Sequence, residues 1–108
     1  MTDDEKMLLV AKACGWTLEN VEGSVICAEL GRSGRRFNPL HNANDMLEIL
    51  SNLGLSLMAD RESKLAWCHV KAGSPHFYFQ TIVPANGNMK AALCRAVFEV
   101  AAKIGETL

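Results

Sequence analysis

Residues 64–83 read KLAWCHVKAGSPHFYFQTIV, and this stretch carries the pattern that decides the fold. Large apolar residues alternate with other residues from Lys64 to Val70 and again from His76 to Val83, which predicts two strands. The cluster Lys71-Ala-Gly-Ser-Pro75 between them is typical of a turn. Leu55 to Asp60 alternates in the same way and is followed by the turn Arg61-Glu-Ser63, so a three-stranded meander is expected.

The hairpin turn predicts a register for the last two strands. If they pair across it, His69 faces His76, Trp67 faces Tyr78 and Leu65 faces Gln80. These residues then share one sheet face, which is aromatic but polar at its tips and therefore suited to contact with a partner or ligand. The alternative is that the chain's own Trp16 segment partly covers this face. The opposite face is expected to pack on helices and holds Ala66, Cys68, Phe77, Phe79, Thr81 and Val83.

Local signals predict three helices. Thr2-Asp-Asp-Glu5 has the form of a capping box, so a first helix is expected from Asp3 to Cys14, closed by Gly15. The sequence then predicts an extended segment from Phe37 to Leu40, because Pro39 disfavours helix at Asn38. The other two helices are expected to begin after Asn42 or Asn44 and end at Gly54, and to run from Met89 to Lys103 with closure at Gly105.

One further strand is predicted between the first two helices, from Val25 to Leu30 after a turn at Glu22-Gly-Ser24. The expected order is therefore α-β-α-β-β-β-α, an α+β fold in which a small antiparallel meander sheet packs with three helices. A chain of 108 residues fits one domain, spanning residues 1–108.

Composition excludes several classes of function. The formal net charge is -1, whereas a general nucleic-acid binder has a basic excess, so nucleic acid is not expected as a partner. No apolar run is long enough to span a bilayer, and the acidic start MTDDEKMLLV differs from a secretory signal, so a cytoplasmic location is expected. The four cysteines form no CxxC pair and are expected to be reduced core residues.

The loop Gly31-Arg-Ser-Gly-Arg-Arg36 concentrates three arginines. It admits two interpretations, an anion clamp in which Arg35 and Arg36 each bind a phosphate, or a solvated loop. The loop lacks the Gly-Lys-Ser/Thr of a P-loop and the third glycine of a dinucleotide fingerprint.

No residue pattern predicts a specific reaction, metal or cofactor. His69 and His76 alone are too few for a closed zinc site, and Cys68 alternates to the opposite face from His69. A hydrolase would need at least two of five residues to converge, which are His41, His69, His76, Asp60 and Glu62.

Three motifs are shared with a known group. They are AKACGW at residues 11–16, FNPLHNANDMLEILSNLG at 37–54 and AALCRAVFEVAAKIG at 91–105. Together with the two-strand hairpin they resemble the phage ABA sandwich domain and NinX-like small phage proteins over nearly the whole chain. The resemblance implies a phage or prophage accessory protein with helices packed on an antiparallel sheet. It implies no catalytic residue, and GRSGRR is not part of the shared pattern.

The sequence favours a non-enzymatic binding module of phage origin over an enzyme. Its ligand would be a host protein or a small anionic, nucleotide-like molecule, with candidate contacts at Arg35, Arg36, Trp67, His69, His76, Tyr78 and Gln80. The alternative is a structural or assembly protein that self-associates, as a dimer, through the hairpin face. A small hydrolase is the least favoured reading.

Overall fold

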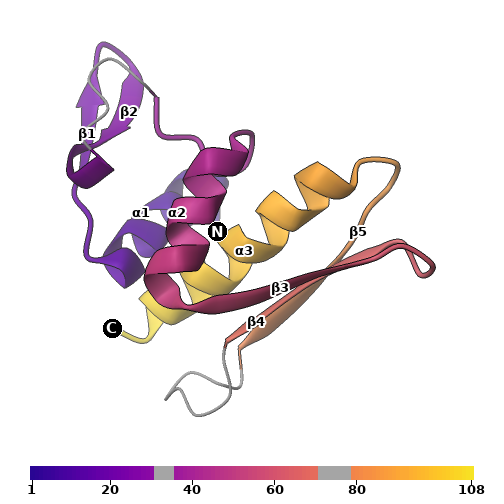
Figure 1. Cartoon of the computed structure of the whole chain (residues 1–108). Helices are drawn as coiled ribbons and strands as arrows, with labels where there is room; N and C mark the ends of the chain where they lie inside the picture. The colour runs from indigo at the N-terminus through magenta and orange to yellow at the C-terminus, as the bar shows by residue number, and fades with distance from the viewer. Residues whose placement is uncertain (31–35, 71–78) are drawn as a thin grey trace.

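The computed structural model describes residues 1–30, 36–70 and 79–108, and these form three helices and two small antiparallel sheets (Figure 1). The α+β class is therefore confirmed, with one strand more than the expected order. The elements are α1 (Asp3–Cys14), β1 (Leu18–Val21), β2 (Ser24–Cys27), the 3-10 helix η1 (Ala28–Leu30), α2 (Ala43–Leu53), β3 (Leu55–Asp60), β4 (Leu65–Val70), β5 (Gln80–Pro84) and α3 (Met89–Glu106).

Helix α1 has the predicted bounds because both of its ends are set by local hydrogen bonds. The amide of Glu5 donates to the Thr2 hydroxyl at 3.2 Å, and the Thr2 amide donates to the Glu5 carboxylate at 3.3 Å. Gly15 closes the helix in the left-handed conformation, with φ of 73°. The expected capping box and stop signal are both present.

The hairpin β1–β2 corrects the expectation of a single strand from Val25 to Leu30. Leu18 pairs with Cys27 and Val21 with Ser24, across a turn in which Glu22 and Gly23 have φ of 51° and 82°. Two positive φ values match the twist of a tight hairpin. Strand β2 ends at Cys27, where η1 begins. Strand β1 was missed because its middle residues are polar and exposed, so its sequence shows no alternation of apolar residues.

The segment before α2 turns at residues 39–41, which corrects the expected extended stretch from Phe37 to Leu40 in its second half. The amides of His41 and Asn42 both donate to the Asn38 carbonyl, at 3.2 and 2.8 Å. Asp45 is 1% exposed, and its carboxylate accepts the Asn38 amide at 2.9 Å. Of the two candidate caps, Asn42 starts α2, since its side chain accepts the amides of Asn44 and Asp45.

Helix α3 runs past Gly105, which the sequence predicted as its end. Gly105 is helical and buried against α1, and a Cβ placed there would lie 2.0 Å from the Leu9 carbonyl oxygen. The glycine therefore lets the backbones of α1 and α3 approach closely. Its conformation is not left-handed, so the stop signal was wrong for a tertiary reason.

The larger sheet has the order β3-β4-β5 and confirms the three-stranded meander within the described residues. The predicted register is wrong. Trp67 lies opposite Ile82, not Tyr78, and His69 lies opposite Gln80, not His76. Leu65 lies opposite Pro84, not Gln80, so each partner is displaced by four positions. Because four is even, the division of residues between the two faces of the sheet is unchanged.

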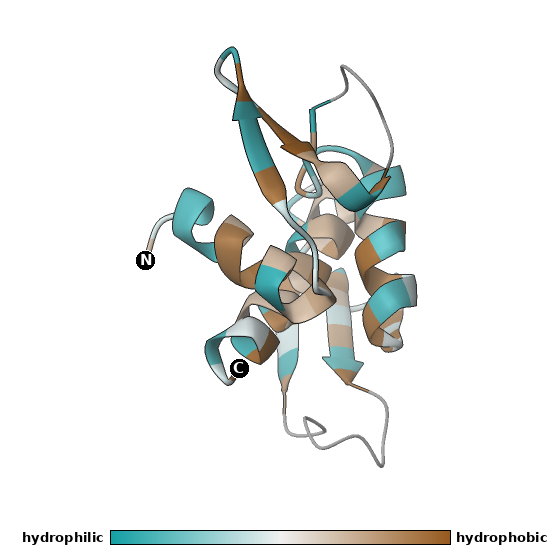
Figure 2. Ribbon diagram, turned by 90° about the vertical axis from the view of Figure 1, so that its left-hand side faces the viewer, coloured by the Kyte–Doolittle hydropathy of each residue, from teal (hydrophilic) through white to brown (hydrophobic). Residues whose placement is uncertain are grey.

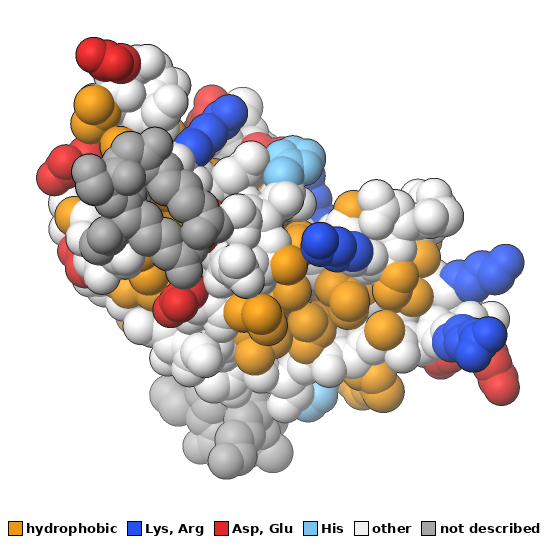
Figure 3. Space-filling model, turned by 45° about the horizontal axis from the view of Figure 1, so that its top comes forward, with side chains coloured by type: hydrophobic (Ala, Val, Ile, Leu, Met, Phe, Trp, Pro, Cys, Tyr) orange, Lys and Arg blue, Asp and Glu red, His pale blue; other side chains and the backbone are white. Residues whose placement is uncertain are grey.

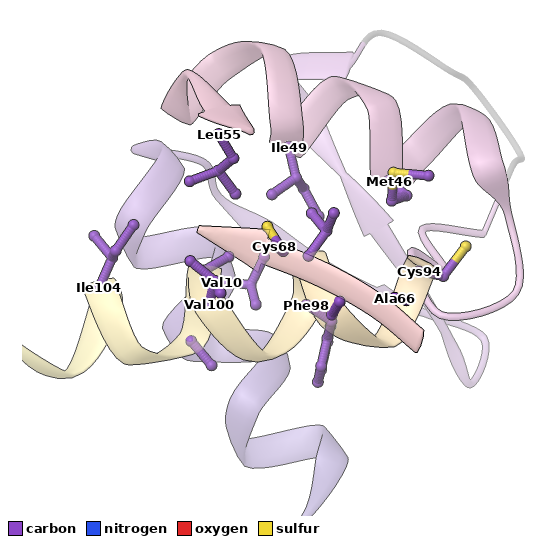
Figure 4. Close-up of a cluster of buried hydrophobic side chains, with 14 of the residues drawn as sticks. Val10, Met46, Ile49, Leu55, Ala66, Cys68, Cys94, Phe98, Val100 and Ile104 are labelled. Atoms are coloured by element: carbon purple, nitrogen blue, oxygen red, sulfur yellow. The ribbon is translucent and has the colours of Figure 1, made fainter. Parts of the chain in front are cut away.

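The core lies between the inner face of this sheet and the helices, with α3 packed along the strands (Figure 4). Ala66 and Cys68 of β4 are 0% exposed, as are Val97 and Phe98 of α3. The two sheets lie at opposite ends of the described structure, with hairpin β1–β2 projecting from the helices (Figure 2).

Candidate functional site

The outer face of the β3-β4-β5 sheet is the candidate binding surface. Strand pairing arranges nine residues of this face in three cross-strand rows. Its central row crosses the sheet from Met58 through Trp67 to Ile82, and Met58 and Ile82 are 47% and 56% exposed. We call this surface the Trp67 face; its rows are Ser56–His69–Gln80, Met58–Trp67–Ile82 and Asp60–Leu65–Pro84.

Three predicted site residues hold one another in place on this face. The Trp67 indole N–H donates to the Gln80 side-chain oxygen at 3.1 Å. The His69 ring lies beside the indole, with ring centroids 4.9 Å apart and an interplanar angle of 40°. His69 Nδ1 lies 3.2 Å from the Val70 carbonyl. Trp67 therefore presents a fixed aromatic surface whose polar atom already has a partner.

The inner face of the sheet shows why Trp67 must point outward. Ala66 and Cys68, its neighbours in β4, are fully buried under α3. Phe79 and Val83 are half-buried against the same core. Successive residues of a strand point to opposite faces, so the burial of one set exposes the other. The predicted separation of Trp67 from Phe79 is confirmed, and Phe77 lies outside the described residues.

Sequence reasoning missed Met58 and Ile82 as members of the site. Both are exposed apolar residues that flank Trp67 in the central row. The alternation in Leu55 to Asp60 already placed Met58 on the face opposite Leu57, so that signal was available. Ile82 required the true register, because the predicted one put Tyr78 beside Trp67.

The basic loop is separate from the Trp67 face where the structure describes it. Arg35, His76 and Tyr78 lie outside the described residues. Arg36 is exposed and lines a hollow of about 440 Å³ beside α1 and hairpin β1–β2. Asp4 and Glu19 line the same hollow, so its charge is mixed. Hairpin β1–β2, which borders this hollow, and strand β4, which carries Trp67, lie at opposite ends of the described structure (Figure 1), so Arg36 and Trp67 do not share one site.

The hydrolase candidates do not form a cluster in the part of the chain that is described. His41 lines a hollow of about 350 Å³ with Arg95, whereas His69 lies on the Trp67 face. The Asp60 carboxylate accepts the amides of Glu62 and Ser63 at 3.0 and 3.2 Å. The Ser63 side chain and these two amides lower the pKa of Asp60, and the amide bonds shape the β3–β4 turn. Residues 1–30, 36–70 and 79–108 contain no group of three or more metal-ligating side chains.

The hollow beside His41 has a cation whose charge is already paired. The Arg95 guanidinium makes two bonds to the Asp3 carboxylate, at 2.9 and 3.0 Å, and a third to Glu99 at 3.3 Å. The Asp3 bond lowers the pKa of that carboxyl group. Lys6 donates to the same Glu99 at 2.9 Å. This network joins α1 to α3 and is structural.

The cysteine thiols are predicted to be unreactive in the native protein. All four are free, and burial raises the pKa of Cys14 and Cys68 to about 12. At pH 8 a thiol with that pKa is ionised on the order of 10⁻⁴ of the time, and the thiolate is the nucleophile. Titration with a thiol-reactive chromogen at pH 8 should modify no thiol rapidly before denaturant is added and four afterwards. One fast thiol in the native state would contradict this prediction.

The same pKa shifts set a pH dependence of stability. Each buried thiol ionises at a higher pH in the folded state than in the unfolded chain. Their contribution to stability is therefore complete below pH 9 and falls as the pH rises from about 9 toward 12.

Comparisons with known proteins matched no family model, no curated protein and no solved structure. In addition, the described helices include none with the length and hydropathy of a membrane span. The functional argument therefore rests on the geometry of the Trp67 face.

Proposed function

We propose that this chain is a non-enzymatic binding module that contacts a partner protein through the Trp67 face. The observation that carries the proposal is the row from Met58 to Ile82, in which an oriented indole lies between two exposed aliphatic side chains. Aromatic residues and methionine are enriched at protein interfaces, and an apolar row on an open sheet gains free energy when a partner covers it.

Two features favour a protein partner over a nucleotide. The nine residues of the Trp67 face include Asp60 but neither lysine nor arginine, so this face offers no cation to a phosphate group. Arg36, the predicted phosphate ligand that the structure describes, lines a hollow beside α1 and hairpin β1–β2 instead. A flat apolar row flanked by His69 and Gln80 instead resembles the centre of a protein interface with polar groups at its edge.

We infer the class of partner from the resemblance of the sequence to small phage proteins. Small phage accessory proteins act inside the host cell, so we propose a host protein in the bacterial cytoplasm as the partner.

The test compares two charged substitutions of exposed apolar residues. Ile82→Asp places a carboxylate in the central row, whereas Val21→Asp is a control at a 45% exposed position in β1. Immobilised wild-type chain and the Val21→Asp variant should retain the same protein from a bacterial extract, and Ile82→Asp should lose it. A buried apolar contact replaced by a charge should reduce affinity by a factor of ten or more, at about 1.4 kcal/mol per tenfold change.

Other outcomes would favour the other readings. Thermal stabilisation by a nucleotide that is lost in Arg36→Ala would support the small anionic ligand. A dimer of this chain that dissociates in the Ile82→Asp variant, with no other protein retained, would support self-association through the Trp67 face.

A further inference from the structure

The outer edge of β3 has main-chain groups that point away from the sheet. The Val70 amide donates to the Phe79 carbonyl at 3.2 Å, and the Ala85 amide donates to the Lys64 carbonyl at 2.8 Å. In an antiparallel ladder, successive residues of a central strand bond alternately to its two neighbours. Even-numbered residues of β4 therefore bond to β5, and its odd-numbered residues bond to β3.

This alternation identifies the free groups on β3. The β4 residues that bond to β3 are Leu65, Trp67 and His69, and their partners are Asp60, Met58 and Ser56. The amide and carbonyl groups of the three intervening residues consequently face outward. These residues are Leu55, Leu57 and Ala59, and no hydrogen bond from another described element reaches their main chain.

The other edge of the sheet, formed by β5, is blocked against pairing with a further strand. On β5 the same alternation turns the groups of Gln80, Ile82 and Pro84 outward. The Lys103 ammonium group donates to the Gln80 carbonyl at 2.9 Å, and Pro84 has no amide hydrogen. A lysine and a proline are devices by which natural sheets block edge pairing. Strand β3 has neither a lysine nor a proline, and its one charged residue, Asp60, is its last.

We propose that the edge of β3 pairs antiparallel with β3 of a second copy of this chain, with Leu57 opposite Leu57. A two-fold axis perpendicular to the sheet joins the inner faces of the two copies to each other, and likewise their outer faces. This symmetry requires that the sequence numbers of two residues lying opposite each other add up to an even number. The Leu57 register pairs all three outward-facing residues, because Leu55 then lies opposite Ala59. It forms six main-chain hydrogen bonds and joins the two sheets into one of six strands.

The side chains in this register favour a second copy as the occupant. Met58 lies beside Ser56 of the other copy on the outer face, and Leu57 meets Leu57 on the inner face. Asp60 falls opposite Gly54, so no like charges are paired. Figure 3 shows hydrophobic side chains in a band that runs toward the Lys and Arg side chains at the end of the molecule where the β3–β4 turn lies. Leu47 of α2, which packs on β3, is 51% exposed and adds apolar area.

The first experiment measures the mass of the whole chain by light scattering over a concentration series. The wild type should approach twice the monomer mass. Ala59→Pro should remain monomeric, because it removes an outward amide while leaving every bond between β3 and β4 intact. Ile82→Asp should remain dimeric, because Ile82 lies on β5 and not on the edge. This variant therefore separates failure of the edge pairing from failure of the proposed Trp67 interface.

The second experiment needs no substitution, so it holds even if Ala59→Pro does not fold. Residue-resolved amide exchange should show Leu57 and Ala59 protected to the same degree as Met58, with protection lost on dilution. The proposal is overturned if the chain is monomeric at all concentrations. It is equally overturned if the Met58 amide is protected from exchange while the Leu57 and Ala59 amides are not. It is also overturned if a folded Ala59→Pro variant still dimerises, or if protection of Leu57 requires a different protein.

Discussion

The Gly105→Ala variant is expected to be less stable than the wild type by about 3 kcal/mol, the upper range for overpacking a close-packed site. The added Cβ would lie 2.0 Å from the Leu9 carbonyl oxygen and 2.6 Å from its carbon, both of which are backbone atoms. A backbone cannot rotate away as a side chain can, so α1 and α3 must separate. The free energy of unfolding in urea measures the effect.

The direction of the stability change in Gly105→Ala distinguishes close helix packing from helix propensity. In an isolated helix, alanine is more favourable than glycine by about 1 kcal/mol, so helix propensity predicts the opposite change. The control is Glu106→Ala, at the next position of α3, which is exposed and should change stability by less than about 0.5 kcal/mol. If Gly105→Ala were as stable as the wild type, the close approach of α1 and α3 would be wrong.

The Phe98→Ala variant is expected to lose about 3 to 5 kcal/mol, because it removes the largest fully buried side chain of the described core. Phe98 is 0% exposed and lies on α3, the helix that supports the inner face of the sheet. In a domain of this size such a loss lowers Tm by more than about 12 °C. Thermal unfolding followed by circular dichroism measures it.

Two comparisons test the cause of that loss. Phe98→Leu fills most of the space and should lose clearly less than the alanine variant. Ile82→Ala removes a side chain of similar chemistry from a 56% exposed site and should change stability by less than about 0.5 kcal/mol. Equal losses for Phe98→Ala and Ile82→Ala would contradict the burial of Phe98 and the exposure of Ile82.

The parts of the fold that were predicted correctly depend on short-range interactions. The bounds of α1 follow from bonds between Thr2 and Glu5 and from the left-handed Gly15. The start of α2 follows from the Asn42 cap, and its end from Gly54. The separation of Trp67 from Phe79 follows from strand alternation, which is a property of the chain and does not depend on register.

The missed elements depend on partners that are distant in sequence or on loop geometry. Strand β1 is a strand because it pairs with β2, although Glu19 and Asn20 show no apolar pattern. The register between β4 and β5 was predicted from a tight turn at residues 71–75. The observed pairing of Trp67 with Ile82 instead adds that residue to the candidate site.

The sequence by itself determined the α+β class, the three helices, the meander and the faces on which Trp67, His69 and Gln80 lie. Each of these follows from caps, breakers and periodicity within a few residues. The tertiary structure alone decided the role of Gly105, the cross-strand partner of Trp67 and the open edge at β3. Those features depend on which backbone lies next to which, and backbone neighbours are set by packing among elements far apart in the chain.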